Sequence, residues 1–149
     1  MVIQRVQTLY LLLGVVAMSV FLFVPFGYTT FADAGNIMLS AWRPLDMAGL
    51  LVPSCASIFL MLVAVFLFKS QGVQRMVVVF SSLLALASIG VVVYFMTAGF
   101  ADANAAVSVT GSKWSWGVAL PVCAVLLQVA AIRGITRDMN LLASYDRLR

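Results

Sequence analysis

Few side chains in this sequence are of the types that perform chemistry on a substrate. The 149 residues contain no histidine, two cysteines and only five acidic residues, all of them aspartates. General acid–base catalysis and metal binding need histidine, carboxylate or thiolate groups that lie close together. The aspartates are instead scattered, at positions 33, 46, 102, 138 and 146. The sequence therefore predicts no catalytic residue, no metal site and no cofactor, and we expect the protein not to be an enzyme.

The two cysteines are the remaining candidates for chemistry. Cys55 and Cys123 each lie two residues after a proline, Pro53 and Pro121, in apolar sequence. The favoured interpretation is a small buried residue at a helix contact, with a disulfide or a redox pair as the alternative. The prolines predict kinks in matching places, which serve helix packing or, alternatively, mark a transport site.

These residues are set in sequence that is too apolar for a soluble domain. Hydrophobic residues make up 64% and charged residues 9% of the chain, and the mean hydropathy is +1.11. Soluble domains carry about 25% charged residues, and a helix needs about 20 apolar residues to cross a bilayer. Four charge-free stretches have that length, near residues 6–26, 47–68, 76–101 and 114–132. We expect an all-α membrane protein with four transmembrane helices, in a single membrane domain at residues 1–149.

The first stretch also has features of a secretory signal, since Arg5 precedes it and Ala32-Asp33-Ala34 follows it. The apolar core of a signal is about 7–15 residues long, which is shorter than this stretch. We therefore expect a retained helix, and a cleaved signal is the alternative.

The basic residues are distributed unequally between the two sides of such a bundle. The side with both termini carries seven of them, and the other side carries only Arg43 and Lys113. Loops rich in lysine and arginine stay in the cytoplasm, and aromatic rings gather at membrane boundaries. The aromatic residues at the opposite boundary are Tyr28, Trp42, Trp114 and Trp116. The sequence predicts cytoplasmic termini, and because this topology explains the positive net charge, we expect no nucleic-acid partner.

Three short matches recur in the same order in the two halves of the chain. They pair Gln4-Arg5 with Gln74-Arg75, residues 31–34 (FADA) with 100–103, and residues 53–56 with 121–124. Matches at a nearly constant separation indicate an internal repeat. We expect a tandem duplication of a two-helix hairpin, with repeat 1 at 1–71 and repeat 2 at 72–149, related by rotation about the membrane normal. The FADA motif then marks the outer end of the first helix in each copy.

The two outer segments contain short runs that are typical of strands. They are NIMLSAW at residues 36–42 and AVSVT at residues 106–110. We expect these two runs to pair as a small β cap on the outer face.

The few polar residues within or beside the spans have structural interpretations. Gln128 is expected to form a hydrogen bond between helices, and Ser81, Ala85 and Ser88 form a stripe of small residues for close packing. Asp46, directly before the second span, is interpreted as a helix N-cap.

The two ends of the chain carry its most specific sequence, VIQRVQTLYLLL from residue 2 and IRGITRDMNLLASYDRLR from residue 132. They resemble a family of small four-span bacterial membrane proteins of unknown function, which open with I-Q-R-I-Q-[ST]-x-[YW]-L-L and close with R-x-I-x-x-D-x-x-L-x-x-S-x-D-R-L-R. The register around Ser144 departs from that pattern. The resemblance implies a bacterial inner-membrane location and supplies no activity. The matching residues are Ile3, Gln4, Arg5, Gln7, Thr8, Tyr10, Arg133, Ile135, Asp138, Leu141, Asp146, Arg147, Leu148 and Arg149.

The C-terminal tail at residues 136–149 is predicted to be an amphipathic helix along the inner interface, continuous with the fourth span or bent from it. It brings the two family-like ends together, and we expect Arg5 to pair with Asp146 in preference to Asp138, with a solvated tail as the alternative. The candidate cytosolic interaction surface comprises Gln4, Arg5, Gln7, Arg133, Arg137, Asp138, Asp146, Arg147 and Arg149.

Three functions are compatible with this sequence. The favoured one is a non-catalytic accessory or scaffold subunit of an inner-membrane complex, which docks through its cytosolic termini onto a protein partner or a second copy of itself. The second is a small carrier or channel for an uncharged or lipid-like solute, which the duplication and the paired prolines favour. The third is a membrane enzyme that uses Asp46 or Asp102 at the outer rim, and the missing histidine counts against it. Membrane lipid is a partner in all three.

Overall fold

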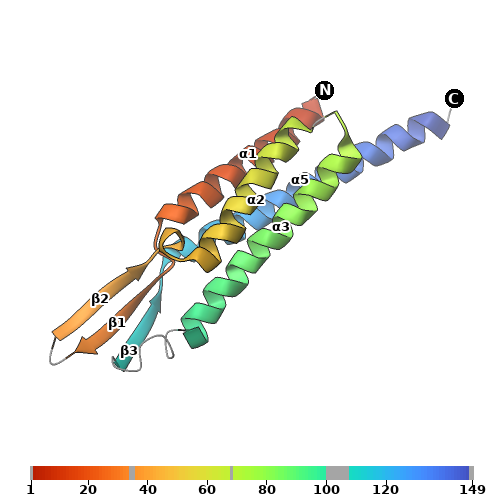
Figure 1. The fold of residues 1–149 in the computed structure, drawn as a ribbon. Coiled ribbons are helices and arrows are strands. Elements are labelled where there is room, and N and C mark those ends of the chain that lie inside the picture. The colour runs from red at the N-terminus through yellow and green to blue at the C-terminus, as the bar shows by residue number, and fades with distance from the viewer. Residues whose placement is uncertain (1, 34–35, 68, 100–107, 148–149) are drawn as a thin grey trace.

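The computed structural model describes residues 2–33, 36–67, 69–99 and 108–147. Its four long helices are α1 (Val2–Phe23), α2 (Ala48–Phe66), α3 (Gln71–Tyr94) and α5 (Ala119–Arg147), and they form an up-and-down bundle (Figure 1). Each is long and apolar enough to cross a membrane, which confirms the expectation of four helices of spanning length. Both termini lie at one end of the bundle, and a small sheet lies at the other.

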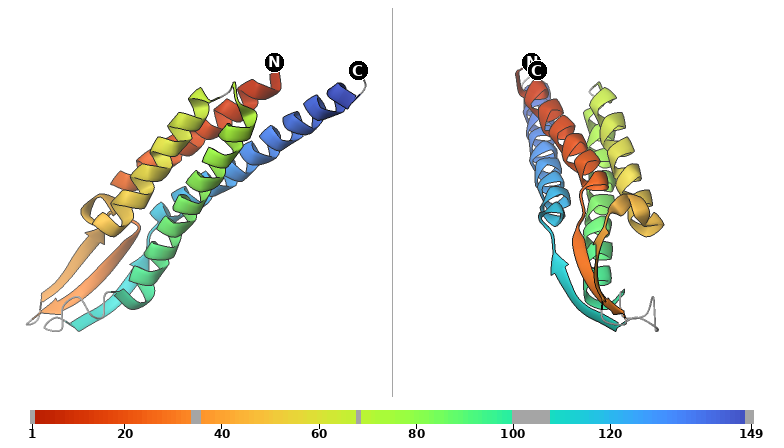
Figure 2. Two further views of the ribbon diagram at one scale, coloured as in Figure 1. Left: turned by 45° about the vertical axis from the view of Figure 1, so that its right-hand side comes forward. Right: turned by 90° about the vertical axis from the view of Figure 1, so that its left-hand side faces the viewer.

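The helices form a ring in which each one packs against two neighbours. α1 contacts α2 and α5, and α3 contacts the same two helices. Figure 2 shows α1 beside α5 and α2 beside α3 when the molecule is turned by 90°. The first and last helices of the chain are therefore neighbours, which places the two ends of the sequence side by side.

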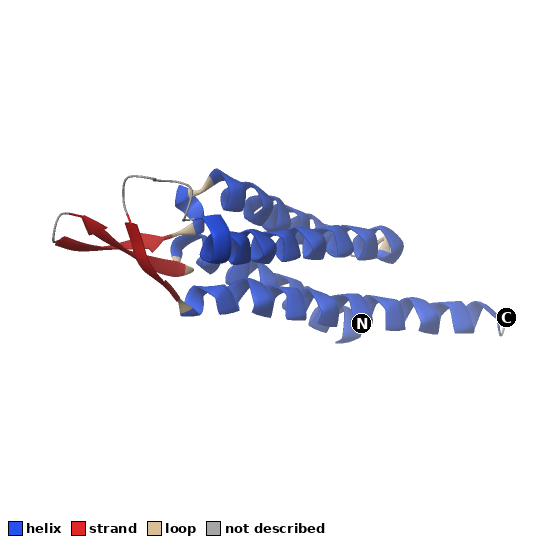
Figure 3. Ribbon diagram, turned by 90° about the horizontal axis from the view of Figure 1, so that it is seen from below, coloured by secondary structure: helices blue, strands red, loops and turns tan. Residues whose placement is uncertain are grey.

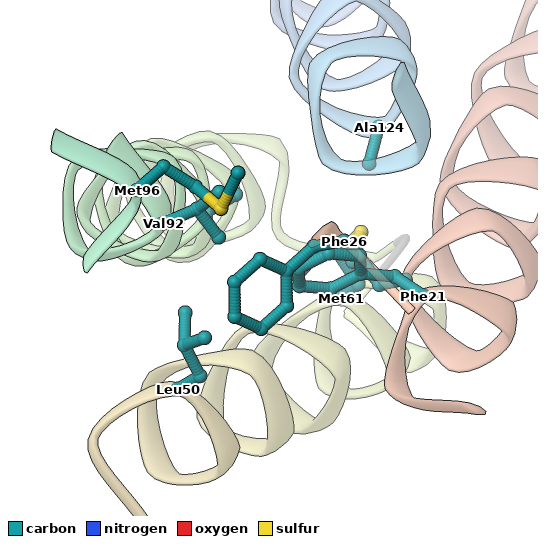
Figure 4. Packing of buried hydrophobic residues seen from close by; sticks show 9 residues of the cluster. Phe21, Phe26, Leu50, Met61, Val92, Met96 and Ala124 are labelled. Carbon is teal, nitrogen blue, oxygen red and sulfur yellow. The ribbon is translucent and has the colours of Figure 1, made fainter. Parts of the chain in front are cut away.

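The centre of the bundle is filled by apolar side chains from all four helices and from Phe26, just beyond α1. Figure 4 shows Phe21, Leu50, Met61 and Ala124 converging on it, and all four are fully buried. A second cluster continues the core toward the termini, with Leu11, Ala64, Val78, Ala131 and Ile135. The middle of the bundle is thus a packed core.

The outer surface of the bundle is also apolar. Val52, Phe59 and Phe66 on α2 are 67%, 65% and 77% exposed, and comparable side chains line the other helices. In water such a surface would be unstable, whereas lipid tails are as apolar as these side chains. The outer surface is therefore suited to contact with lipid.

The sheet has three antiparallel strands, β1 (Gly27–Asp33), β2 (Asn36–Trp42) and β3 (Ser108–Trp114), in the order β2-β1-β3. The expected β cap is therefore present, but β2 and β3 do not pair with each other. Each pairs with β1, which contains residues 31–33 of the first FADA motif, so the expectation that this motif ends a helix is wrong. The second FADA motif, at residues 100–103, lies outside the described residues.

The reason for this difference lies just after α1. The helix ends at Phe23, because a proline at position 25 disfavours the helical conformation in the residue before it. Gly27 then starts β1, and the β-branched Thr29 and Thr30 favour an extended chain. The first span is consequently shorter at its outer end than the predicted 6–26.

The other helix boundaries also differ from the predicted spans. α3 begins at Gln71, earlier than the expected residue 76, and continues into a π-helical turn, η2 (Phe95–Gly99). α5 begins at Ala119, later than the expected residue 114. Trp114 is still part of β3, and a short 3-10 helix at residues 116–118 precedes α5. α5 then continues without interruption through most of the predicted tail, to Arg147.

The strands β2 and β3 lead into their helices in the same manner. Each ends in a tryptophan that pairs with Gly27, Trp42 on one side and Trp114 on the other. Each is followed by a short 3-10 helix, η1 (Pro44–Asp46) or η3 (Trp116–Val118), and then by a long helix. The backbone of Phe26 joins the two, since its N–H donates to the Trp42 carbonyl at 2.9 Å and its carbonyl accepts from Ser115 N–H at 3.0 Å.

Two predictions about this region are wrong. Asp46 belongs to η1 and does not cap α2, whose N-cap is Met47 and has no side-chain cap hydrogen bond. The two prolines do not take matching places, since Pro53 lies inside α2 whereas Pro121 lies in the first turn of α5. A proline in a first turn removes no intrahelical hydrogen bond, so only Pro53 is placed to bend its helix.

Candidate functional site

A layer of buried polar side chains crosses the middle of the bundle. Ser57 on α2 and Ser81 on α3 are both fully buried, and each hydroxyl donates to the other residue's backbone carbonyl at 3.0 Å. Gln128 on α5 adds a third helix, because its Nε2 donates to Ser81 Oγ at 3.2 Å. Nearer the sheet, Ser54 and Ser88 share a hydrogen bond of 3.2 Å. The predictions of an interhelical bond from Gln128 and of a buried small-residue stripe on α3 are confirmed.

The chemistry available to this layer is limited by its composition. Every buried polar side chain in the described part of the chain is a serine, threonine or glutamine, so none of them carries a charge or transfers a proton near neutral pH. Gln128 Oε1 is buried without a hydrogen-bond partner among the described residues. The layer links three helices, and its serine hydroxyls are hydrogen-bonded to backbone carbonyls and to polar side chains.

The sequence interpretation missed several members of this buried polar set, among them Ser54, Ser57 and Gln74. Ser54 and Ser57 face inward on α2 and complete the contacts of the stripe on α3. Gln74 is buried near the other end of α3, where its Nε2 donates to the Ala64 carbonyl at 3.0 Å. The three-residue step between the two serines places them on one helix face, which is the signal that could have identified them.

The cysteines are not buried packing residues, as the sequence interpretation had them. Cys55 and Cys123 are free thiols with exposed side chains. Each is adjacent to a fully buried residue, Ser54 or Ala124, which takes the inward position on the helix. The thiols therefore face the outer, apolar surface of the bundle.

At the terminal end of the bundle, the two family-like sequence ends meet through Gln7 and Asp138. Gln7 on α1 is 4% exposed, and its Nε2 donates to Asp138 Oδ2 on α5 at 2.5 Å. Gly134 makes room for the contact, because a Cβ at that position would lie 3.0 Å from Gln7 Cγ. A part-buried hydrogen bond of this kind contributes about 1 kcal/mol to stability. This contact holds the C-terminal half of α5 against the start of α1.

The remaining residues of the candidate surface have different placements. Arg133 and Arg137 are exposed on α5, where they line a shallow groove of about 540 Å³ together with Thr136 and Asn140. Gln4 and Arg5 lie on α1, and Asp146 and Arg147 lie on α5, but their side chains fall outside the described set, as does the whole of Arg149. The pairing of Arg5 with Asp146 therefore remains a prediction, and the contact that the structure does show for Asp138 is with Gln7.

The Gln7–Asp138 contact predicts a measurable coupling between the two ends of the sequence. We expect Gln7→Leu and Asp138→Leu each to lower the apparent Tm of the purified protein in detergent, since each leaves one polar partner unpaired. The double variant should lose less than the two single losses combined, with a coupling of about 1 kcal/mol. Strictly additive losses would show that the contact contributes nothing to stability, and Asn140→Leu, an exposed change on the same helix, is the control.

The bundle and the small sheet define a class of protein. Four apolar helices of spanning length, a packed centre and a three-stranded sheet at one end indicate a small multi-pass membrane protein, and its described residues include no group of three or more potential metal ligands. The chain belongs to the family described as "Domain of unknown function (DUF4293)", whose model matches residues 3–148. No curated protein matches the sequence. A family of unknown function is what the resemblance at the two ends implies.

Proposed function

We propose that this protein is a non-catalytic accessory or scaffold subunit of a bacterial inner-membrane complex, and that it docks through the end of the bundle that carries both termini. The observation that carries the proposal is the projection of α5. In Figure 3 the helix reaches past the N-terminus and past the ends of the other helices. Its residues 140–144 are all exposed, and Leu141 and Leu142 among them are 45% and 57% exposed.

A projecting helix with exposed leucines is suited to binding another protein. When a partner covers apolar side chains on a helix that projects from its bundle, the buried apolar surface stabilises the complex. The Gln7–Asp138 hydrogen bond lies at the base of the projection and holds α5 against α1. Arg133 and Arg137 are exposed on the same helix, and their positive charges can orient a partner.

The two competing functions receive less support from the geometry. A carrier needs an internal route, but Met18, Phe21 and Met61 fill the centre of the bundle and are fully buried. Two pockets among the described residues, one lined by α3 and α5 and one lined by α5 alone, lie on the outside of the bundle. For the enzyme, Asp46 is exposed on η1 and is not part of any described metal-binding group, and Asp102 lies outside the described residues.

The accessory role is tested by purification of the tagged, full-length protein from its native membrane in mild detergent. We expect a stoichiometric partner that is retained by Leu141→Met/Leu142→Met and lost with Leu141→Glu/Leu142→Glu. The methionine pair keeps the apolar surface and the glutamate pair removes it, while both changes sit on exposed positions. If the glutamate pair keeps its partner, or if the wild type purifies alone as a monomer, the proposal is wrong; a homo-oligomer lost in the same variant identifies a second copy as the partner.

The proposed orientation places the termini in the cytoplasm and the sheet outside. In a background without Cys55 and Cys123, an impermeant thiol reagent added to intact cells should modify Ser112→Cys and spare Gly72→Cys. Both positions are exposed, on β3 and at the start of α3. Lysed cells should show labelling of both, which serves as the control. The opposite pattern in intact cells would reverse the orientation.

The tandem duplication is supported by the shared order of strand, tryptophan, 3-10 helix and long helix in the two halves. This order pairs Trp42 with Trp114, a separation of 72 residues, and it does not include β1. We propose that the halves descend from one hairpin that contained these shared elements. The proposal predicts that the halves of other family members align with each other over these same elements; halves that share only hydrophobicity contradict it.

A further inference from the structure

A pocket on the outside of the bundle lies where α3 and α5 pack against each other, near the end that carries the termini. It has a volume of about 340 Å³ and is lined by Gly72, Arg75, Met76, Val79, Phe80 and Met139. Arg75 is the only charged residue of the lining, and the other residues are apolar. The pocket therefore combines one cation with an apolar wall.

The cation and the apolar wall are arranged in sequence along α3. Arg75 lies in the second turn of the helix, and Val79 and Phe80 follow about one turn deeper, which corresponds to about 6–8 Å along the axis. Met76 and Phe80 are 62% and 59% exposed, so their side chains are open to the surroundings. A molecule that fits this order has a charged head at the end of the span and an apolar chain that lies along its wall.

The basic residues at this end of the bundle indicate that the headgroup of the bound molecule is negatively charged. Lys69, Arg75, Arg133 and Arg137 are all exposed, whereas Asp138, the one acidic side chain described there, already accepts a hydrogen bond from Gln7. Arg75 makes no ion pair with any described residue. Space beside it is open, because a Cβ on Gly72 would meet no atom within 4 Å. A guanidinium binds a phosphate through charge-assisted hydrogen bonds that are often bidentate.

We propose that this pocket binds an anionic phospholipid of the surrounding bilayer. Arg75 binds the phosphate, and an acyl chain lies along Met76, Phe80 and Met139. Basic pockets between spanning helices are suited to anionic headgroups, and an acyl chain adds apolar contact that a free phosphate cannot make. The site is separate from the exposed leucines of α5 and does not depend on the proposed docking function.

The site is tested with the purified full-length protein in mild detergent by native mass spectrometry. Phosphatidylglycerol or phosphatidylcholine is added in stated amounts, and the number of retained lipids is measured. We expect phosphatidylglycerol to be retained in preference to phosphatidylcholine. Arg75→Gln should weaken its retention about fivefold, which is the factor that one basic residue contributes near an anionic surface. Arg75→Lys should retain most of the binding.

The controls separate this site from general electrostatic attraction and from free phosphate. Lys69→Gln removes an exposed cation at the same end that does not line the pocket, and it should leave retention unchanged. Excess inorganic phosphate should not displace the lipid. Equal retention of the two lipids by the wild type, an equal loss in Lys69→Gln, or displacement by inorganic phosphate would overturn the proposal. The apparent Tm of Arg75→Gln without added lipid should match the wild type, because Arg75 is exposed.

Discussion

Replacement of Gly117 by alanine is expected to lower the apparent Tm of the protein by about 2–10 °C, although it adds one methyl group. Gly117 is buried in η3, where a Cβ would lie 2.4 Å from the backbone carbonyl oxygen of Pro25 and 3.1 Å from its carbonyl carbon. Backbone atoms cannot rotate away as a side chain does, so the segment between α1 and β1 has to move. Overpacking of this kind costs about 1–3 kcal/mol, which corresponds to a shift of this size for a chain of this length.

The matched control for Gly117→Ala is Gly90→Ala. Gly90 is in α3 and exposed, and a Cβ there would meet no atom within 4 Å. This change should leave the protein as stable or raise its stability slightly, since alanine favours a helix more than glycine does. Both variants are measured by thermal unfolding of the detergent-solubilised protein. A Tm for Gly117→Ala at or above the wild-type value would contradict the close approach of η3 to Pro25.

Replacement of Ser81 by leucine is expected to lower the stability of the helix bundle strongly. The paired hydrogen bonds between Ser81 and Ser57 bring the backbones of α3 and α2 close together, with each hydroxyl 3.0 Å from the opposite carbonyl oxygen. A leucine side chain does not fit in that space, and it also removes one of the two acceptors of Gln128 Nε2, the other being Met61 Sδ. The cost combines overpacking of about 1–3 kcal/mol with lost interhelical hydrogen bonds of about 0.6 kcal/mol each.

Two variants separate the causes of this effect. Ser81→Ala loses the hydrogen bonds of the Ser81 hydroxyl without adding volume, while Ser57 Oγ can still donate to the carbonyl of residue 81, so it should cost much less than Ser81→Leu. Ala87→Leu adds the same side chain to an exposed position of α3 and should be nearly neutral. Purified yield and apparent Tm in detergent are the measurements. Similar values for Ser81→Leu and Ala87→Leu would mean that the two helices do not pack closely at this level.

The four helices could be predicted because a bilayer imposes a length and excludes charge, and both properties are visible in the sequence. The central strand could not be predicted in the same way. β1 follows an apolar helix with little change in composition, and the expected helix end at residues 31–34 rested on a repeated motif. The local signals that were decisive are Pro25 and the two threonines after Gly27, and these signals were outweighed by the length of the apolar stretch.

The inward faces of the helices were harder to predict, for a physical reason. When lipid replaces water, the outside of a helix is as apolar as its inside, so hydrophobic periodicity no longer marks the buried face. Cys55 and Cys123 were for this reason interpreted as buried although they are exposed. Polar and small residues remained informative, and Gln128, Ser81 and Ser88 were placed correctly because lipid does not satisfy their hydrogen bonds.

The candidate surface was predicted in its location and only partly in its contacts. The sequence indicated that the two family-like ends meet, and α1 and α5 do pack together there. That Gln7 takes Asp138 as its partner depends on Gly134, which leaves space for the amide, and no pattern in the sequence expresses that distance.

Site-specific photo-crosslinking in the native membrane tests most directly whether the projecting part of α5 is a docking surface. A photoreactive residue is placed at Leu142, at Phe59 on the apolar face of α2, or at Trp116 at the sheet end, all of which are exposed. A docking role of α5 predicts that Leu142 gives one discrete protein adduct of constant mass, and that Phe59 and Trp116 do not give it. Adducts from Phe59 or Trp116 without any from Leu142 would contradict it, as would a Leu142 position that reacts with lipid alone.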